Sequence, residues 1–255
     1  MLKKNLSLLQ KKIKMKEDNI YQKLKDILVE MGGDFSILEE QVDINLQVEF
    51  FELVNELSEN KREEKVVFEE ANTLFNPETE IEKKKKLLAE LSTIDKPESY
   101  RMIEKVVNTK DDEIYSWSVL ALQHCRIGLE TSLLDENQIF ISTGLGGKGE
   151  KLRYFIACKL KTGEYFSDTQ KKVVQTEFED IFEKNNCRIE KVTFVEKYVS
   201  IIALIPIEVS IGNVIKSSIA ECNQYGDFLY QQYLITNVKM LDYPEIKKFF
   251  KDKGL

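Results

Sequence analysis

Histidine is almost absent from this sequence, which has a single copy at position 124. Imidazole is the usual general base near neutral pH and the commonest metal ligand in proteins. One copy therefore excludes metal sites built on histidine pairs, and it excludes nucleases and proteases that need two imidazoles. A Ser-His-Asp or Cys-His mechanism would depend on His124 alone. The apolar pattern around His124 predicts a helix there, so we expect it to pack or form an interface rather than act as a base.

Cysteine is also scarce, and its four copies are widely separated. Their spacing matches neither a zinc knuckle nor a CxxC redox pair. We expect small buried side chains in a reducing compartment, with no structural metal and no cofactor. The four residues are Cys125, Cys158, Cys187 and Cys222.

Proline and glycine are few, with 4 and 11 copies, while 42% of residues are hydrophobic and 32% are charged. This composition predicts a folded, soluble, helix-rich protein. The longest apolar runs, such as Val199–Ile207, are too short to span a bilayer, so no transmembrane segment is expected. No signal peptide is evident, and a cytoplasmic location follows as the default expectation.

The first 16 residues form a basic leader that contains six lysines and no acidic residue. Three interpretations remain open for it. It could lie on an anionic membrane surface, it could be a first helix that packs on the second, or it could precede a true start at Met15. We expect one of the last two.

Charge is distributed unevenly between the two halves of the chain. Residues 1–136 hold 20 Lys and Arg against 29 Asp and Glu, a net charge of −9, whereas residues 137–255 hold 17 against 15, a net charge of +2. An acidic surface repels phosphate backbones, because their affinity for proteins comes largely from Lys and Arg contacts. A nucleic-acid role would therefore use the second half or the leader.

Apolar residues recur at spacings of three and four from residue 17 to about 134, which predicts a domain of amphipathic helices over residues 1–136. The first stripe runs from Ile20 to Met31. Asn76-Pro77 is expected to start a later helix, with asparagine as the N-cap and proline at the first helical position. Residues 77–130 resemble degenerate HEAT-type helical repeats. This resemblance implies a packed helix array that offers a binding surface.

After Asn137 the apolar period changes to two, which predicts strands. The expected order over residues 137–255 is strand-helix-strand-strand-helix-strand, the ferredoxin-like arrangement of an antiparallel sheet with two helices on one face. Ser167 and Gln170 form a capping box, Ser210 is a second N-cap, and Gly226 ends a helix. A short terminal helix is expected over Tyr243–Lys251. The whole chain is thus predicted to be an α+β protein.

Residues 152–229 resemble the single-strand (HUH-type) tyrosine transposase domain of small insertion sequences. The likeness rests on the element order, on Phe166-Ser-Asp-Thr at the start of a helix, and on Lys197-Tyr-Val-Ser-Ile-Ile. In that family the last segment reads Asp-His-Val-His-Leu-Leu, and its two histidines hold a divalent metal. Here Tyr198 and Ser200 stand at those degenerate metal positions, so the resemblance implies a module without its metal.

The reaction of that family needs a metal to stabilise the charge that builds on the scissile phosphate. We therefore expect an inactive module and no enzymatic activity. Tyr225, Tyr230 and Tyr233 are the tyrosines to consider as a nucleophile, and each is better interpreted as a helix or sheet aromatic.

The most unusual local sequence is the glycine-rich loop between Ser142 and Arg153. Glycines let successive backbone N–H groups converge on an anion, and nearby cations complement its charge. The spacing does not match a P-loop. Two interpretations stay open, a mobile turn and a site for a phosphate-bearing ligand or an acidic partner surface. The residues concerned are Gly144, Gly146, Gly147, Lys148, Gly149, Lys151 and Arg153.

These observations predict a non-enzymatic cytoplasmic adaptor with an unidentified protein partner, bound by the helical array or the glycine-rich loop. The alternative is a binder of structured single-stranded RNA or DNA that uses residues 137–255. A weaker third hypothesis is a small-molecule sensor that uses the edge of the sheet. The sequence does not specify the partner or the oligomeric state.

Overall fold

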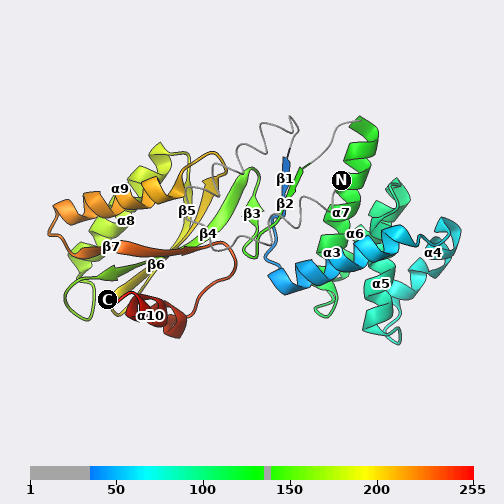
Figure 1. Ribbon diagram of the computed structural model, residues 1–255, viewed down its shortest axis with the longest axis horizontal. Helices are drawn as coiled ribbons and strands as arrows, with labels where there is room; N and C mark the ends of the chain where they lie inside the picture. The colour runs from blue at the N-terminus through cyan, green and yellow to red at the C-terminus, as the bar shows by residue number, and fades with distance from the viewer. Residues whose placement is uncertain (1–34, 135–138) are drawn as a thin grey trace. The chain divides into compact units, whose positions relative to one another are not determined.

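The computed structural model describes residues 35–134 and 139–255, which form two compact units. The helical unit comprises residues 35–149 with 237–239, and the sheet unit comprises residues 150–236 with 240–255 (Figure 1). The expected α+β class is confirmed, because the described residues contain both helices and an antiparallel sheet. The leader Met1–Lys16, the alternative start at Met15 and the apolar stripe Ile20–Met31 lie outside the described residues.

The helical unit contains five α-helices among the described residues, and α7 is the longest at 20 residues. No helix within the described ranges is both long and apolar enough to cross a bilayer. The elements, in chain order, are β1 (Phe35–Ile37), α3 (Ile44–Glu59), α4 (Glu64–Glu70), the 3-10 helix η1 (Ala71–Phe75), α5 (Ile81–Ser92), α6 (Pro97–Thr109), α7 (Tyr115–Leu134), β2 (Ile139–Ile141) and β3 (Gly147–Lys148).

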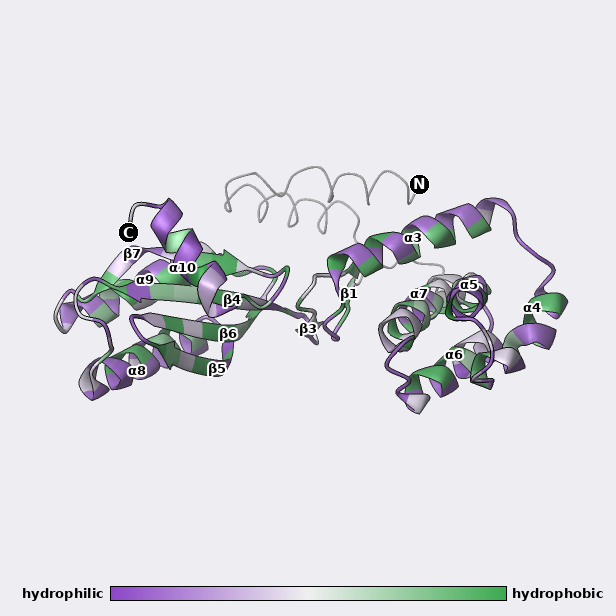
Figure 2. Ribbon diagram, turned by 90° about the horizontal axis from the view of Figure 1, so that it is seen from below, coloured by the Kyte–Doolittle hydropathy of each residue, from purple (hydrophilic) through white to green (hydrophobic). Residues whose placement is uncertain are grey.

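The core of the helical unit forms around two large aromatic residues. Phe50 of α3 and Trp117 of α7 are fully buried, and their rings meet edge to face at 5.3 Å. The Trp117 indole Nε1 donates a hydrogen bond to the Lys85 carbonyl of α5 at 2.8 Å, so its polar atom is satisfied inside the core. In Figure 2, α3 shows alternating hydrophilic and hydrophobic bands, as the spacing of three and four predicts.

The predicted helix start at Asn76-Pro77 is wrong. The Asn76 carboxamide oxygen accepts the N–H of Glu78 at 3.0 Å, and the Asn76 carbonyl accepts the N–H of Thr79 at 3.2 Å. These bonds form a local turn, which competes with helix initiation as asparagine side chains commonly do. Helix α5 therefore begins at Ile81, with Glu80 as its N-cap.

The boundary between the units differs from the one predicted between residues 136 and 137. Strand β2, which was expected in the second domain, pairs in parallel with β1, with Phe35 opposite Ile139 and Ile37 opposite Ile141. Residues 142–149 also belong to the helical unit, where the Gly147 N–H donates to the Glu39 carbonyl, and the division lies after Gly149. A three-residue strand such as β1 has too few positions for an alternating pattern to reveal it.

The sheet unit has the strand order β7-β4-β6-β5, and all neighbours in it are antiparallel. Helix α8 connects β4 to β5, and α9 connects β6 to β7. The bounds are β4 (Lys151–Leu160), α8 (Asp168–Lys184), β5 (Arg188–Val195), β6 (Tyr198–Pro206), α9 (Ile211–Gln224), β7 (Leu229–Thr236) and α10 (Tyr243–Asp252).

Side-chain alternation gives the two faces of this sheet different neighbours. On β6, Val199, Ile201 and Ala203 belong to the core that the sheet shares with α8 and α9. Tyr198 and Ser200 alternate with them and so point to the opposite face. Figure 1 shows α8 and α9 above the sheet and α10 beneath it.

Helix ends in the sheet unit follow most of the predicted signals. The capping box of Ser167 and Gln170 is present, with both of its hydrogen bonds formed. Ser210 is the N-cap of α9, but its side chain makes no capping bond. Beyond the end of α9, Gly226 has a φ of 141°, a conformation that favours glycine.

Candidate functional site

The glycine-rich loop packs tightly against its own unit. A Cβ atom at Gly144 would lie 1.6 Å from the carbonyl oxygen of Val238, and one at Gly146 would lie 2.4 Å from the carbonyl oxygen of Glu39. No side chain fits at such distances, so these two glycines are needed for close approach of backbone to backbone. This observation gives the glycines a packing role.

Two amide groups of the loop already have acceptors within the chain. The Gly149 N–H donates to the Glu39 carboxylate at 2.9 Å, and the Gly147 N–H donates to the Glu39 carbonyl at 3.4 Å. A carboxylate of the protein thus occupies the kind of position that a bound anion would take. Anion binding by this loop stays a prediction, and these contacts favour a structural turn.

The three cations of the loop segment have different surroundings. Lys148 is exposed in the helical unit. In the sheet unit, the Lys151 ammonium donates to the carbonyl of Asn186 at 2.6 Å and to its side-chain oxygen at 3.0 Å. The Arg153 guanidinium pairs with the Glu190 carboxylate at 2.6 and 3.1 Å. Lys151 and Arg153 therefore serve contacts within the sheet unit.

Tyr198, at the first degenerate metal position, is buried in an aromatic cluster. It is 4% exposed, and its ring lies 5.7 Å from Tyr243 and 5.6 Å from Phe250, both on α10. Burial and the nearby charge of Glu196 raise the pKa of the Tyr198 phenol. The ring thus forms part of the contact between α10 and the sheet.

Ser200, at the second degenerate position, bonds within the sheet. Its hydroxyl donates to the carbonyl of Thr193 on β5 at 3.5 Å. The imidazole ligands of the resembled family are missing from both positions, and neither supplies a carboxylate or thiolate in their place. No cluster of three or more His, Cys, Asp or Glu side chains suited to a metal occurs among the described residues. The residues present do not fit the divalent cation that the transposase resemblance implies.

Tyr243 is the tyrosine that the sequence reasoning missed. It opens α10 and donates its hydroxyl hydrogen bond to the Glu196 carboxylate at the turn between β5 and β6. That hydrogen bond raises the pKa of the Tyr243 phenol to about 12. Its signal in the sequence was the Asp242–Glu245 capping box, which marks the helix start but not the face of the sheet that the helix covers.

The tyrosines that were considered as nucleophiles lie outside the contact between α10 and the sheet. Tyr225 follows the end of α9 and is 65% exposed. Tyr230 and Tyr233 lie on β7, and Tyr233 packs against the core on the helix-covered face. The interpretation as helix and sheet aromatics agrees with these positions.

Lys159 is the cation next to Tyr198. The two residues are directly opposite each other on β4 and β6, and Lys159 is 8% exposed. Its ammonium lies 5.5 Å from the ring centroid of Tyr230. No ion pair in the described part of the chain involves this ammonium. Burial, and then the charge of Lys197, lower the pKa of Lys159.

The single histidine and the cysteines are structural. The His124 Nδ1 lies 2.9 Å from the carbonyl oxygen of Ser92, and its ring contacts Phe50 and Phe51 at 6.2 and 6.3 Å. The predicted packing role is confirmed. All four cysteines are buried, and burial raises the pKa of each thiol, to about 12 for Cys125 and about 11 for Cys187. A thiol with a raised pKa is a poor nucleophile.

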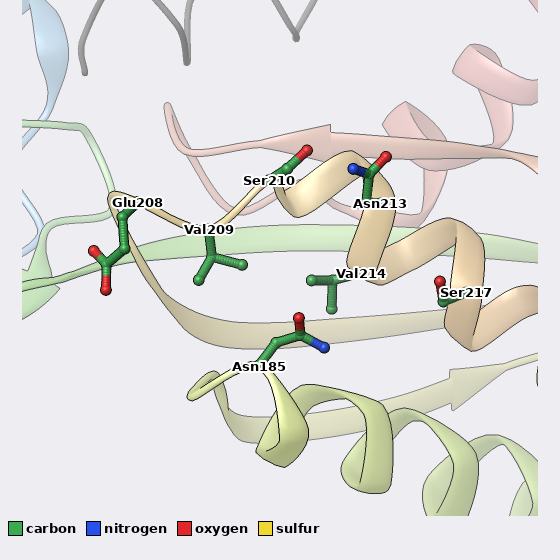
Figure 3. Close-up of a pocket in the computed structure, with 7 residues that line it drawn as sticks. All are labelled: Asn185, Glu208, Val209, Ser210, Asn213, Val214 and Ser217. Carbon is green, nitrogen blue, oxygen red and sulfur yellow. The ribbon is translucent and has the colours of Figure 1, made fainter. Parts of the chain in front are cut away.

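Each unit has a hollow that is lined by described residues. An open pocket of about 300 Å³ lies between the end of α8 and the start of α9, where Val209, Val214 and Asn185 point toward one another (Figure 3). Glu208 places a carboxylate at its edge. In the helical unit, a groove of about 270 Å³, here called the α6–α7 groove, is lined by Tyr100, Arg126, Leu129, Glu130 and Leu133.

No protein-family model matches the sequence, and no curated protein matches it. Comparison with solved structures, in contrast, returns transposases. One, from Deinococcus radiodurans R1, is assigned as a transposase; it is 15% identical, has a TM-score of 0.36, and the match covers 42% of this chain and 94% of that chain. Another is a REP-associated tyrosine transposase bound to a REP hairpin, 7% identical with a TM-score of 0.32.

The match to the REP-associated transposase covers 41% of this chain and 63% of that chain, so the present chain spans less than two thirds of it. Both of these solved structures are described as transposases.

Proposed function

We propose that this chain is a binding protein and not an enzyme, with a catalytically inactive transposase-like module as its sheet unit. The observation that carries the proposal is the burial of Tyr198 between Tyr243 and Phe250, at a position where the resembled family holds a metal. An aromatic ring packed against a helix supplies no ligand for a cation. Strand order and helix placement further support a ferredoxin-like classification of this unit.

The ionisation of the nearby tyrosines supports the same proposal. A tyrosine becomes a good nucleophile when its phenol loses its proton readily, and a raised pKa opposes that loss. The pKa of Tyr243 is raised, because its neutral hydroxyl donates a hydrogen bond to the Glu196 carboxylate, and that bond is lost when the phenol loses its proton. No imidazole is available in this unit to take the proton.

A titration with Mn²⁺ and Mg²⁺ tests whether the sheet unit binds the divalent cation that catalysis would need. We expect no saturable divalent-ion site by isothermal titration calorimetry, because Tyr198 and Ser200 are poor ligands. The double variant Tyr198→His, Ser200→His is the matched comparison, since it restores the side chains of the resembled family. Tight binding of one ion to the unaltered protein, lost on Ser200→Ala, would contradict the proposal.

A protein partner is best accommodated by the α6–α7 groove. Leu133 is 79% exposed, and together with Leu129 and Tyr100 it forms an apolar stripe beside the Arg126–Glu130 ion pair, whose atoms are 2.8 Å apart. Apolar centres with charged rims are typical of protein interfaces. The packed helices α5, α6 and α7 also support the HEAT-like interpretation, in which such surfaces bind partners.

Affinity purification from native cells tests this surface. We expect Leu133→Asp to lose partners that the unaltered protein retains, because a charge in an apolar interface centre is costly. Phe75→Asp is the matched control, since Phe75 is 44% exposed on η1, outside the groove. Equal recovery of partners by all three proteins would rule out the groove.

Binding of structured single-stranded RNA or DNA by the sheet unit is the second candidate. It is favoured by a cation beside a partly exposed ring, in which Lys159 of β4 lies 5.5 Å from the ring centroid of Tyr230 on β7. Single-strand binders combine stacking rings with cations that neutralise the backbone. A gel shift with hairpin oligonucleotides is expected at low salt and should weaken as salt rises. Absence of a shift at low salt would eliminate this candidate.

A further inference from the structure

The sheet face opposite α8 and α9 carries Tyr198 and Ser200 at the degenerate metal positions and a lysine beside them. The divalent cation implied by the resemblance does not fit Tyr198 and Ser200. Directly opposite Tyr198, however, β4 carries Lys159, whose side chain is more than nine-tenths buried. A cation therefore remains on this face, one strand away from the degenerate metal positions.

Within the described ranges, no ion pair gives Lys159 a counter-charge. Its ammonium faces the Tyr230 ring at 5.5 Å. The neighbouring charge is Lys197, whose backbone carbonyl accepts the N–H of Leu160 at 2.8 Å. Lys161, just beyond the end of β4, is by contrast paired with Asp227 at 2.5 Å. In this part of the chain Lys159 is thus a largely buried cation beside another cation.

Such an arrangement is unfavourable in the protein alone. Burying a charge without a partner costs free energy, and a second like charge adds to that cost. A lysine with a purely structural role would be expected to have a carboxylate partner, as Lys161 has. An anion arriving at this face would remove the cost, and phosphate oxygens accept hydrogen bonds from ammonium groups well.

We propose that Lys159, assisted by Lys197, binds a phosphate group on this face of the sheet without a divalent cation. If the phosphate belongs to single-stranded RNA or DNA, this inference deepens the second candidate function and rests on it. The same chemistry would recognise the phosphate of a free nucleotide. The two sources are separated by the experiment.

The test measures fluorescence anisotropy of a labelled hairpin oligonucleotide at about 50 mM salt, where phosphate contacts are strong. Lys159→Met keeps the length of the buried stem and removes the charge. Lys172→Met is the matched control, because Lys172 is exposed on α8, on the other face of the sheet. Lys159→Arg serves as the conservative rescue. Parallel titrations use AMP and inorganic phosphate.

We expect Lys159→Met to weaken oligonucleotide binding about tenfold or more, the loss typical of a charge-assisted hydrogen bond. Lys172→Met should change it by about twofold or less, because exposed charges contribute little. Lys159→Arg should retain binding, and EDTA should leave it unchanged. The thermal midpoint of Lys159→Met should equal or exceed that of the unaltered protein, since an unpaired buried charge has been removed.

Equal weakening by Lys159→Met and Lys172→Met would overturn the inference, and so would loss of binding in EDTA. If the unaltered protein does not bind the hairpin, the second candidate function fails by itself. Lys159-dependent binding of AMP or phosphate would then uphold the phosphate site with a small-molecule source. Absence of all three interactions would overturn the site as well.

Discussion

Individual side chains decide which chemistry the sheet face can support. Tyr198 fills space with an aromatic ring, Ser200 bonds to a neighbouring strand, and Tyr243 donates its proton toward Glu196. None of these arrangements prepares a nucleophile or a cation site. Each side chain is engaged in holding β5, β6 and α10 together.

The buried position of His124 predicts a pH dependence of stability. Burial lowers its pKa below the ordinary value of 6.5, so the unfolded chain binds the proton more readily than the folded chain. Stability should therefore fall as pH drops below about 6.5, as the unfolded-state imidazole becomes protonated. In urea titrations at successive pH values, the free energy of unfolding of His124→Gln should fall less steeply below about pH 6.5 than that of the unaltered protein. An unchanged slope in the variant would contradict the assignment.

The close approach at Gly144 predicts a large effect of a single methyl group. Gly144→Ala should destabilise the helical unit by about 1–3 kcal/mol, because its Cβ would overlap the Val238 carbonyl. Gly149→Ala is the control, since its Cβ would meet nothing within 4 Å, and only its φ of 57° is unfavourable. Chemical denaturation of both variants measures the difference. Equal small losses would show that the loop can move away.

Residue-scale predictions from sequence succeeded where the cause is local. His124 packs as expected because the apolar spacing around it already specified a helix face. Tyr243 and Lys159 were missed because their roles depend on pairing between distant strands and on the face that α10 covers. A single sequence contains no direct signal for such contacts.

At the scale of elements, two helices of the sheet unit differ in how they begin. Ser167 accepts the N–H of Gln170 at 3.2 Å, and the Gln170 side chain bonds back to Ser167 at 2.9 Å. Ser210 precedes α9 without a side-chain capping bond. The sequence offered the same residue type at both positions, so only the structure distinguishes them.

This difference predicts unequal costs of the same substitution. Ser167→Ala should lower the free energy of unfolding by about 1 kcal/mol, the usual cost of losing an N-cap. Ser210→Ala should lower it by less than about 0.5 kcal/mol, as surface substitutions commonly do. Paired urea denaturation curves provide the comparison. A larger loss at Ser210 would mean that its hydroxyl caps α9 in solution.

Regular elements were the most predictable part of the fold. Strand β5 was expected over Arg188–Val195 and is found there, because the segment is rich in β-branched and aromatic residues, although its register shifts between Ile189 and Lys191. Strand β1 was not expected, since three residues show no period, and the start of α5 was misplaced because Asn76 forms a turn instead of a cap. Short elements and competing local hydrogen bonds explain these misses.

At the scale of the whole molecule, the two halves of the chain differ in charge. Residues 1–136 carry a net charge of −9 and residues 137–255 a net charge of +2. Phosphate groups are therefore expected to approach residues 137–255 more readily than residues 1–136, and the acidic helices are better suited to protein contacts.

The most direct test of this account is a search for a covalent tyrosyl–oligonucleotide adduct. Stoichiometric protein is incubated with single-stranded hairpin DNA and Mn²⁺ or Mg²⁺, and the products are separated under denaturing conditions. The account predicts intact DNA and no adduct, with Tyr243→Phe indistinguishable from the unaltered protein. Cleaved DNA attached to Tyr243, abolished in Tyr243→Phe, would contradict it.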